Sequence, residues 1–135
     1  MTVAGSRVQI QLIGAVGYPR WPSEVMDIEQ RYSDVPPARL RVLTAPAFVA
    51  AKLAAWNDRA APRDLYDLWA LAAAGLIDDE AAALFSQHGP LTRARDVSFS
   101  RIPTPQEWET ALAHQCIPLV SAQEAAAVVA SAWSR

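Results

Sequence analysis

Hydrophobic and polar residues alternate in two short parts of the N-terminal third of the chain. The first lies between Arg7 and Val16 and includes the run Val8-Gln9-Ile10-Gln11-Leu12; the second, Arg39 to Leu43, places its two arginines on one face. A period of two is typical of a half-buried β-strand. We therefore predict strands over 7–16 and 39–43, with a short helix from Ser23 to Gln30 between them. Two strands alone form a marginally stable ribbon, so we expect them to pack on helices, on a second copy of the chain, or on a complementing chain.

After Thr44 the hydrophobic spacing becomes helical and remains so to the C-terminus. Caps, prolines and glycines predict helices over 45–59, 62–75 and 79–87, then an irregular stretch over 88–103, and then helices that begin after Thr104 and Ser121. The last helix should pack on the others through Ala125, Val128, Val129, Ala132 and Trp133. The predicted fold class is α+β and mostly helical, with two short strands followed by a bundle of about five helices. We expect a single domain over 1–135, with a strand-containing part over 1–43 and a helical part over 44–135.

Composition narrows the class of protein. The chain has 135 residues, of which 52% are hydrophobic and 19% charged, as in an ordinary globular domain. The formal net charge of -2 gives no general attraction to nucleic acid, so contact with RNA or DNA would need a local basic patch. One cysteine, Cys116, excludes an internal disulfide and a thiolate metal site. No leader or long apolar run is visible, so we predict a cytoplasmic protein without a membrane span.

Charged residues with a chemical role gather in the stretch Phe48 to Leu76. At about 100° per residue on a helix, Phe48, Lys52, Trp56 and Arg59 share one arc, and Lys52 is the only lysine of the chain. A lysine on an apolar face is costly to bury without a partner, so an anion should lie nearby.

Asp64 and Asp67 are three residues apart in the next predicted helix and project beside its apolar stripe, which consists of Leu65, Leu68, Trp69, Ala72 and Leu76. Two interpretations stay open. Asp64 can complement the positive end of its helix while Asp67 pairs with Lys52 or Arg59. Alternatively, the two carboxylates serve a phosphate or metal site.

One motif carries a family resemblance. The strand RLRVLT is followed by a run that reads Lys52-Leu-Ala-Ala, then Arg59-Ala-Ala-Pro-Arg63-Asp64-Leu-Tyr66-Asp67-Leu. This spacing resembles the C-terminal signature of the AbiEii-type nucleotidyltransferase toxins, most clearly over 42–77. That family implies a bacterial toxin of type IV toxin-antitoxin and abortive-infection systems. It also implies a polymerase-β-like domain followed by a helical region, so the two strands would be a remnant of the nucleotidyltransferase sheet.

The resemblance implies a role for each matching residue. Lys52 and Arg59, together with Arg63 and Tyr66, would bind the NTP, and Asp64 and Asp67 would be the catalytic acids. A lysine and an arginine suit phosphate oxygens, and transfer chemistry rests on positioning and charge stabilisation. Tyr66 and Trp56 can stack on a base or ribose, although core packing is the more ordinary role of the tryptophans. The family also implies Mg²⁺ and NTP as cofactors if the chain is active, a cognate antitoxin, and tRNA as an acceptor in some members.

The chain departs from the family in its acids. It contains no Asp-x-Asp pair: after Gly5-Ser6 the first acids are Glu24 and Asp27, and Gln9 and Gln11 stand in the strand where a further acid is often found. Two-metal chemistry needs those carboxylates, so we predict no metal-binding residues here. We expect the chain to begin midway through the family domain, as a truncated piece.

Three hypotheses about function follow. The first is a partial or degenerate nucleotidyltransferase toxin, active only with a complementing chain. The second is a non-catalytic module that binds a nucleotide, RNA or the antitoxin. The third is a structural remnant, dimerising through its unpaired strands, in which Lys52, Arg59, Asp64 and Asp67 form an ion-pair network.

Overall fold

The computed structural model describes residues 2–3, 6–7, 10–12, 14 and 16–134. Within these residues the fold is α+β and mostly helical, as the sequence predicts. The elements are β1 (Thr2–Val3), β2 (Ser6–Arg7), β3 (Ser23–Asp27), β4 (Arg39–Leu43), α1 (Ala45–Arg59), α2 (Pro62–Ala73), α3 (Asp79–His88), the 3-10 turn η1 (Ala94–Asp96), α4 (Pro105–Leu112) and α5 (Ala122–Trp133).

Local sequence sets where the helices begin. Thr44 and Asp78 each cap a helix by accepting a hydrogen bond from a backbone N–H of the first turn. Thr104 and Ser121 go further and form the reciprocal capping boxes that their sequences predict. The predicted helix boundaries are therefore correct to within one or two residues.

The strands agree less well with the predictions. The helix predicted over Ser23–Gln30 is wrong, because Ser23–Asp27 is β3 and pairs antiparallel with β4, with Ser23 opposite Leu43 and Asp27 opposite Arg39. A short segment such as SEVMD has no strong local preference, and the distant partner strand decides its conformation. Within the strand predicted over 7–16, Arg7 ends β2, and positions 8, 9, 13 and 15 lie outside the described residues. The described residues 10–12 and 14 are not in a strand.

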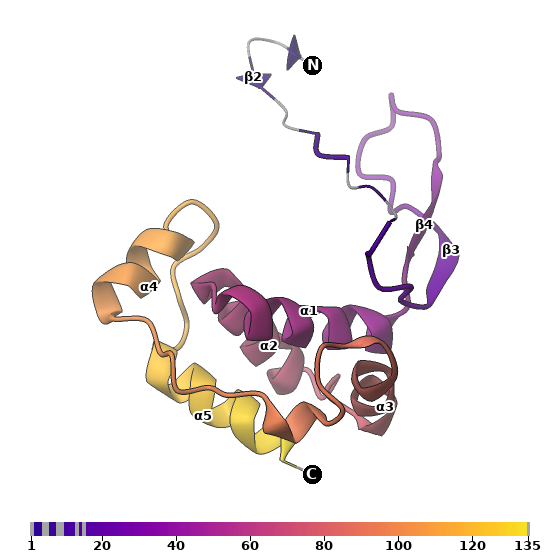
Figure 1. Cartoon of the computed structure of the whole chain (residues 1–135). Coiled ribbons are helices and arrows are strands. Elements are labelled where there is room, and N and C mark those ends of the chain that lie inside the picture. Colours follow the sequence, from indigo (N-terminus) through magenta and orange to yellow (C-terminus); the bar gives the residue numbers. More distant parts are fainter. Residues whose placement is uncertain (1, 4–5, 8–9, 13, 15, 135) are drawn as a thin grey trace.

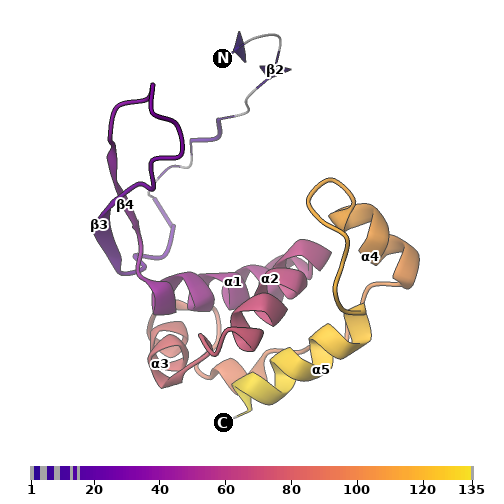
Figure 2. The same ribbon diagram turned by 180° about the vertical axis from the view of Figure 1, so that it is seen from behind.

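The helices form one body from which a two-stranded ribbon projects. In this body α1 packs against α2 and α3, and α2 packs against α5. The ribbon of β3 and β4 rises from the N-terminal end of α1, and α4 lies near the opposite end of α1, as both views show (Figures 1 and 2). No helix among the described residues is long and apolar enough to cross a bilayer.

The hydrophobic core lies between the helices of this body. Its largest fully buried side chains include Trp56, Phe85, Leu53, Leu65 and Leu68. The indole of Trp56 stacks on Phe99 and donates a hydrogen bond to the Ser98 carbonyl at 3.0 Å, which fastens the irregular segment 88–103 to α1. Core packing is therefore the role of Trp56, and stacking on a nucleotide base is not.

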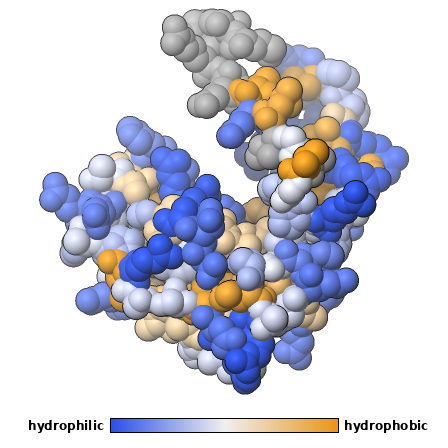
Figure 3. All heavy atoms as spheres, in the orientation of Figure 1, coloured by the Kyte–Doolittle hydropathy of each residue, from blue (hydrophilic) through white to orange (hydrophobic). Residues whose placement is uncertain are grey.

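Two residues predicted on packed faces are instead partly exposed. Val128 of α5 and Leu76 after α2 are each 42% exposed, while Ala126 takes the place of Val128 in the buried face of α5. No residue of β3 or β4 is buried. Hydrophobic surface is visible above α1, where the ribbon and the chain that leads into it lie (Figure 3).

Candidate functional site

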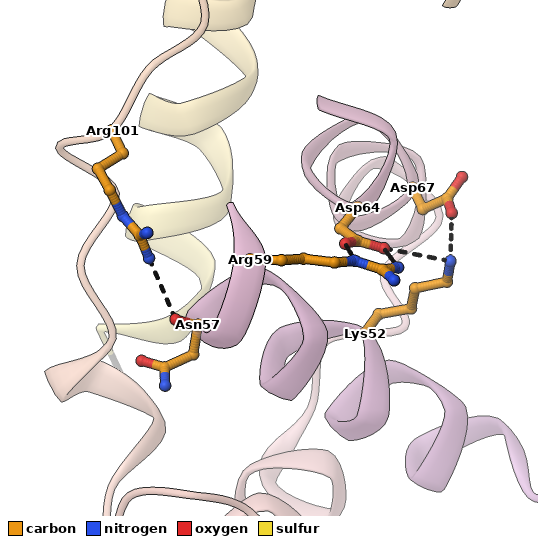
Figure 4. Close-up of polar contacts among 6 residues, drawn as sticks. All are labelled: Lys52, Asn57, Arg59, Asp64, Asp67 and Arg101. Atoms are coloured by element: carbon orange, nitrogen blue, oxygen red, sulfur yellow. Dashed lines mark hydrogen bonds and ion pairs between the residues drawn. The ribbon is translucent and has the colours of Figure 1, made fainter. Parts of the chain in front are cut away.

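The turn between α1 and α2 brings Arg59 against Asp64. Ala60 adopts a left-handed conformation (φ 48°) that ends α1, and Pro62 begins α2, so Asp64 lies in the first turn of the new helix. The guanidinium of Arg59 then donates two hydrogen bonds to this carboxylate, from Nε to Oδ2 at 2.7 Å and from Nη2 to Oδ1 at 3.0 Å. This bidentate pair fixes the angle between the two helices at their junction (Figure 4).

Lys52 joins the same cluster from the middle of α1. Its Nζ lies 2.6 Å from Oδ2 of Asp67 and 3.6 Å from Oδ1 of Asp64, and 5.7 Å from the centre of the Phe48 ring. The structure thus brings together all four of Lys52, Arg59, Asp64 and Asp67, which we call the charged cluster (Figure 4).

The members of the charged cluster differ sharply in exposure. The side chain of Asp64 is fully buried, that of Lys52 is 24% exposed, that of Asp67 41% and that of Arg59 61%. The buried carboxylate is acceptable because both of its oxygens accept charge-assisted contacts from cations. Asp64 is therefore the inner support, and the two cations and Asp67 form the side that faces solvent.

Hydrogen bonding fixes the charge of the outer arginine. The hydrogen bond to Asp64, followed by the attraction of its charge, raises the pKa of Arg59 above its ordinary value. The raised pKa of Arg59 favours its cationic form beside Asp64. Formally the cluster is neutral, so an added anion would have to compete with Asp67 for Lys52.

The geometry contains both features of the first interpretation of Asp64 and Asp67, in which one acid complements the helix end and the other forms an ion pair. Asp64 lies in the first turn of α2, where a carboxylate favours the helix dipole, and Asp67 pairs with Lys52. The sequence did not indicate that Asp64 would take Arg59 and share Lys52 with Asp67. The left-handed residue Ala60, which makes this possible, carries no sequence signal of the kind that a glycine would give.

Arg63 and Tyr66, the other two predicted nucleotide contacts, point toward α4. Arg63 is exposed, and its Nε donates to the Ala111 carbonyl at 3.2 Å. The ring of Tyr66 lies 5.3 Å from that of Trp69 and 5.8 Å from that of Trp108. Burial raises the pKa of the Tyr66 phenol, and a hydrogen bond with Cys116 adds to this effect. The contacts of both residues hold α4 to the body and lie apart from Lys52.

A surface hollow of about 820 Å³ that no sequence motif indicates lies between the α1–α2 junction and α4. Its lining includes Ala60, Pro62, Arg101, Thr104 and Glu107. Arg101 is held there by a hydrogen bond from Nη2 to the Asn57 carbonyl at 3.1 Å (Figure 4). These residues come from two distant segments, 60–62 and 101–111, so no local spacing could have predicted the hollow.

Two structural tests bear on a metal ion in this region. Among the described residues, no group of three or more His, Cys, Asp or Glu side chains is arranged to hold a metal. Asp64 has both oxygens engaged by Arg59 and Lys52, whereas Mg²⁺ requires free oxygen ligands in octahedral geometry. Asp64 and Asp67 as placed here do not fit a magnesium ion.

Comparison with known proteins gives one match. Residues 1–129 match the family described as nucleotidyl transferase AbiEii toxin, type IV toxin-antitoxin system. This range is much wider than the motif over 42–77. Neither the curated proteins nor the solved structures contain a significant match. Because the match covers nearly the whole chain, the chain belongs to the AbiEii family of nucleotidyltransferase toxins.

Proposed function

We propose that this chain is the NTP-binding helical part of an AbiEii-type nucleotidyltransferase toxin and does not transfer nucleotides by itself. The observation that carries the proposal is the position of Lys52. Its ammonium lies at the solvent side of a buried carboxylate, held by two acids and placed over the exposed ring of Phe48. A lysine whose ammonium is positioned by a buried carboxylate and is still accessible to solvent is suited to bind a phosphate.

Each member of the charged cluster has a separate task in this proposal. Lys52 contacts the phosphates, and Arg59, whose side chain is 61% exposed, provides a second cation. Asp64 touches no ligand and acts as a positioning residue for both cations. Asp67, predicted as a catalytic acid, is the carboxylate that a bound phosphate displaces from Lys52. The predicted catalytic role of Asp64 is replaced here by positioning, because its oxygens are already engaged.

The transfer step needs acids that this chain does not supply. The sequence contains no Asp-x-Asp pair, and the two aspartates of the cluster do not fit Mg²⁺. A complementing chain would therefore supply the magnesium-binding carboxylates, and this chain would contribute the phosphate contacts. In that sense it is a partial, truncated family member.

The family suggests the partners, since a type IV system pairs each toxin with a cognate antitoxin. We propose that the chain acts in the cytoplasm, with tRNA as the acceptor once the catalytic acids are present. We also propose that the chain binds a second copy of itself through its unpaired strands.

Calorimetry with ATP, GTP, CTP and UTP, with and without Mg²⁺, tests the binding. We expect at least one NTP to bind, and Lys52→Met to weaken it at least about tenfold, which corresponds to about 1.4 kcal/mol. Arg39→Met is the matched control, because Arg39 also pairs with an aspartate but lies on the ribbon. The absence of binding by the wild-type chain, or equal affinity of the Lys52→Met variant, would refute the proposal.

A transfer assay tests the second half of the proposal. The chain alone, given Mg²⁺, labelled NTP and tRNA, should leave the tRNA unlabelled, because the metal-binding acids are missing. Efficient labelling would show that the chain is a complete enzyme.

A structural role for the charged cluster is the second candidate function. It is favoured by the fact that all four side chains pair with one another. In that case Lys52→Met would lower the free energy of unfolding while no NTP bound to the wild-type chain. Calorimetry combined with urea unfolding of the same two variants separates the two candidates.

A further inference from the structure

The ribbon of β3 and β4 leaves two strand edges open. In the part of the chain that the structure describes, β3 pairs only with β4, and all five residues of β3 are exposed. An open edge presents unpaired N–H and C=O groups, which is an arrangement that readily accepts a further strand.

The hydrogen bonds at the ends of the ribbon show which backbone groups face outward. Ile28 donates its N–H to the Ala38 carbonyl at 2.9 Å, and Thr44 donates its N–H to the Pro22 carbonyl at 3.1 Å. Hydrogen-bonded pairs alternate along an antiparallel ladder, and Pro22 and Ile28 both belong to such pairs. The backbone N–H and C=O groups of the even-numbered residues of β3 therefore point toward β4. The outward groups of β3 are therefore those of Ser23, Val25 and Asp27.

One of these groups already has a weak partner. The Ser23 carbonyl accepts a long contact of 3.4 Å from Nη1 of Arg41, which curls across the ribbon. Val25, at the centre of the edge, is 46% exposed. The middle of the β3 edge is thus open for pairing.

The sequence of β3 is compatible with itself in the antiparallel direction. If Val25 lies opposite Val25 of a second copy, Glu24 lies opposite Met26 and Ser23 opposite Asp27, so no like charges lie directly opposite each other. This register pairs all five residues and forms about six backbone hydrogen bonds between the copies. The two Met26 side chains lie diagonally on one face, and so do the two Glu24 side chains, at the wider diagonal spacing of about 7–8 Å.

The edge of β4 is not compatible with itself. The same arrangement there would place Arg41 directly opposite Arg41, and like charges directly opposite each other destabilise a sheet. A mixed contact of β3 with β4 would leave one edge open on each copy and would continue as an open chain of molecules. Of these three contacts, pairing through β3 is the one that closes a two-fold dimer without placing like charges directly opposite each other.

We propose that β3 is the dimerisation edge of this protein and that two copies join their ribbons into one four-stranded antiparallel sheet with Val25 on the two-fold axis. The inference specifies the second-copy partner included in the proposed function, and it does not depend on nucleotide binding. Lys52→Met should therefore dimerise as the wild-type chain does, whatever the result of calorimetry.

Sedimentation over a range of concentrations tests the dimer with two matched variants. Val25→Pro removes an N–H that faces solvent in the monomer, so it should block the dimer while the ribbon stays formed. Arg41→Pro makes the same change at the opposite residue of β4; it also releases the Ser23 carbonyl for pairing, so it should leave the dimer intact. A monomeric wild-type chain, which would leave β3 to a strand of another protein, would overturn the proposal. Equal loss of the dimer in both variants would overturn it as well.

Disulfide trapping gives an independent reading that needs no proline. In a Cys116→Ser background, Glu24→Cys combined with Met26→Cys places thiols at facing, non-hydrogen-bonded positions of the two copies. The expected Cα separation there is about 4.5 Å, within the range of a disulfide. Leu40→Cys combined with Val42→Cys is the control on β4. Mild oxidation should give a covalent dimer only for the β3 pair; equal trapping on both edges would contradict the assignment.

Discussion

The helical body and the ribbon contain the same ion pair in two different environments. In the body, Nε of Arg59 lies 2.7 Å from Asp64; in the ribbon, Nε of Arg39 lies 2.9 Å from Asp27. The carboxylate of the first pair is fully buried, whereas the side chain of Asp27 is 82% exposed. Distance alone therefore does not distinguish an ion pair that stabilises the fold from a solvent-exposed ion pair that contributes little.

The two regions also differ in how their apolar side chains are covered. The helices bury each other's hydrophobic faces, so Leu53, Leu65 and Phe85 are fully inaccessible. On the ribbon, Met26 and Leu40 share one face and are 48% and 56% exposed. The helices cover one another's apolar side chains, whereas those of the ribbon stay exposed, as the proposed pairing through β3 would require.

Removing a large aromatic side chain should show the largest difference between the two regions. Trp56→Ala should lower the free energy of unfolding by about 4 kcal/mol, because it opens a cavity in the core. It also removes the hydrogen bond that holds segment 88–103. Tyr32→Ala in the ribbon loop, where Tyr32 is 70% exposed, should change the free energy by less than about 0.5 kcal/mol. Urea unfolding monitored by circular dichroism measures both values.

Trp56→Phe serves as a second variant if Trp56→Ala does not fold. It keeps most of the core volume and loses only the bond to Ser98, so it should destabilise the protein less than Trp56→Ala. Equal effects of the core and ribbon substitutions would mean that the ribbon is covered in solution.

Removing the aspartate from each ion pair gives the next largest effect. Asp64→Ala should cost about 3 kcal/mol, because it removes both charge-assisted hydrogen bonds of Arg59 and leaves a gap in place of a fully buried side chain. Asp27→Ala should cost less than about 1 kcal/mol, since both of its charges are hydrated. Urea unfolding measures both changes in the free energy of unfolding. An Asp64→Ala change as small as that of Asp27→Ala would contradict the difference between the two ion pairs.

Local chemistry explains why the sequence predicted the helices well. Thr44, Asp78, Thr104 and Ser121 cap their helices through side chains that reach only three residues along the chain. Such signals are complete within a short window of sequence. The same reasoning failed for Ser23–Asp27, because the strand exists only through its pairing with residues 39–43.

The candidate site was predictable in its members but not in its pairing. The helical arc placed Lys52 and Arg59 together, and spacing placed Asp64 and Asp67 on one side of the next helix. Which acid would be buried depended on the turn at Ala60, whose left-handed conformation follows from packing and not from its residue type. The contact of Arg101 with Asn57 joins positions 44 residues apart and has no local signal at all.

The two capping boxes of the helical body should give the smallest effect, and it should appear as a loss of stability in acid. Hydrogen bonds from the Thr104 backbone and side chain lower the pKa of Glu107, and those from the Ser121 side chain and backbone lower that of Glu124. A pKa that is lower in the folded state adds stability above the ordinary value of 4.5, and this stability is lost as pH falls through the folded value. The free energy of unfolding should therefore be lower at about pH 3 than at about pH 7. This loss should be smaller in the double variant Glu107→Gln/Glu124→Gln than in the wild-type chain. Glu109→Gln, which changes a glutamate of the same helix outside the capping box, should keep the full loss, and an unchanged pH dependence in the double variant would contradict the assignment.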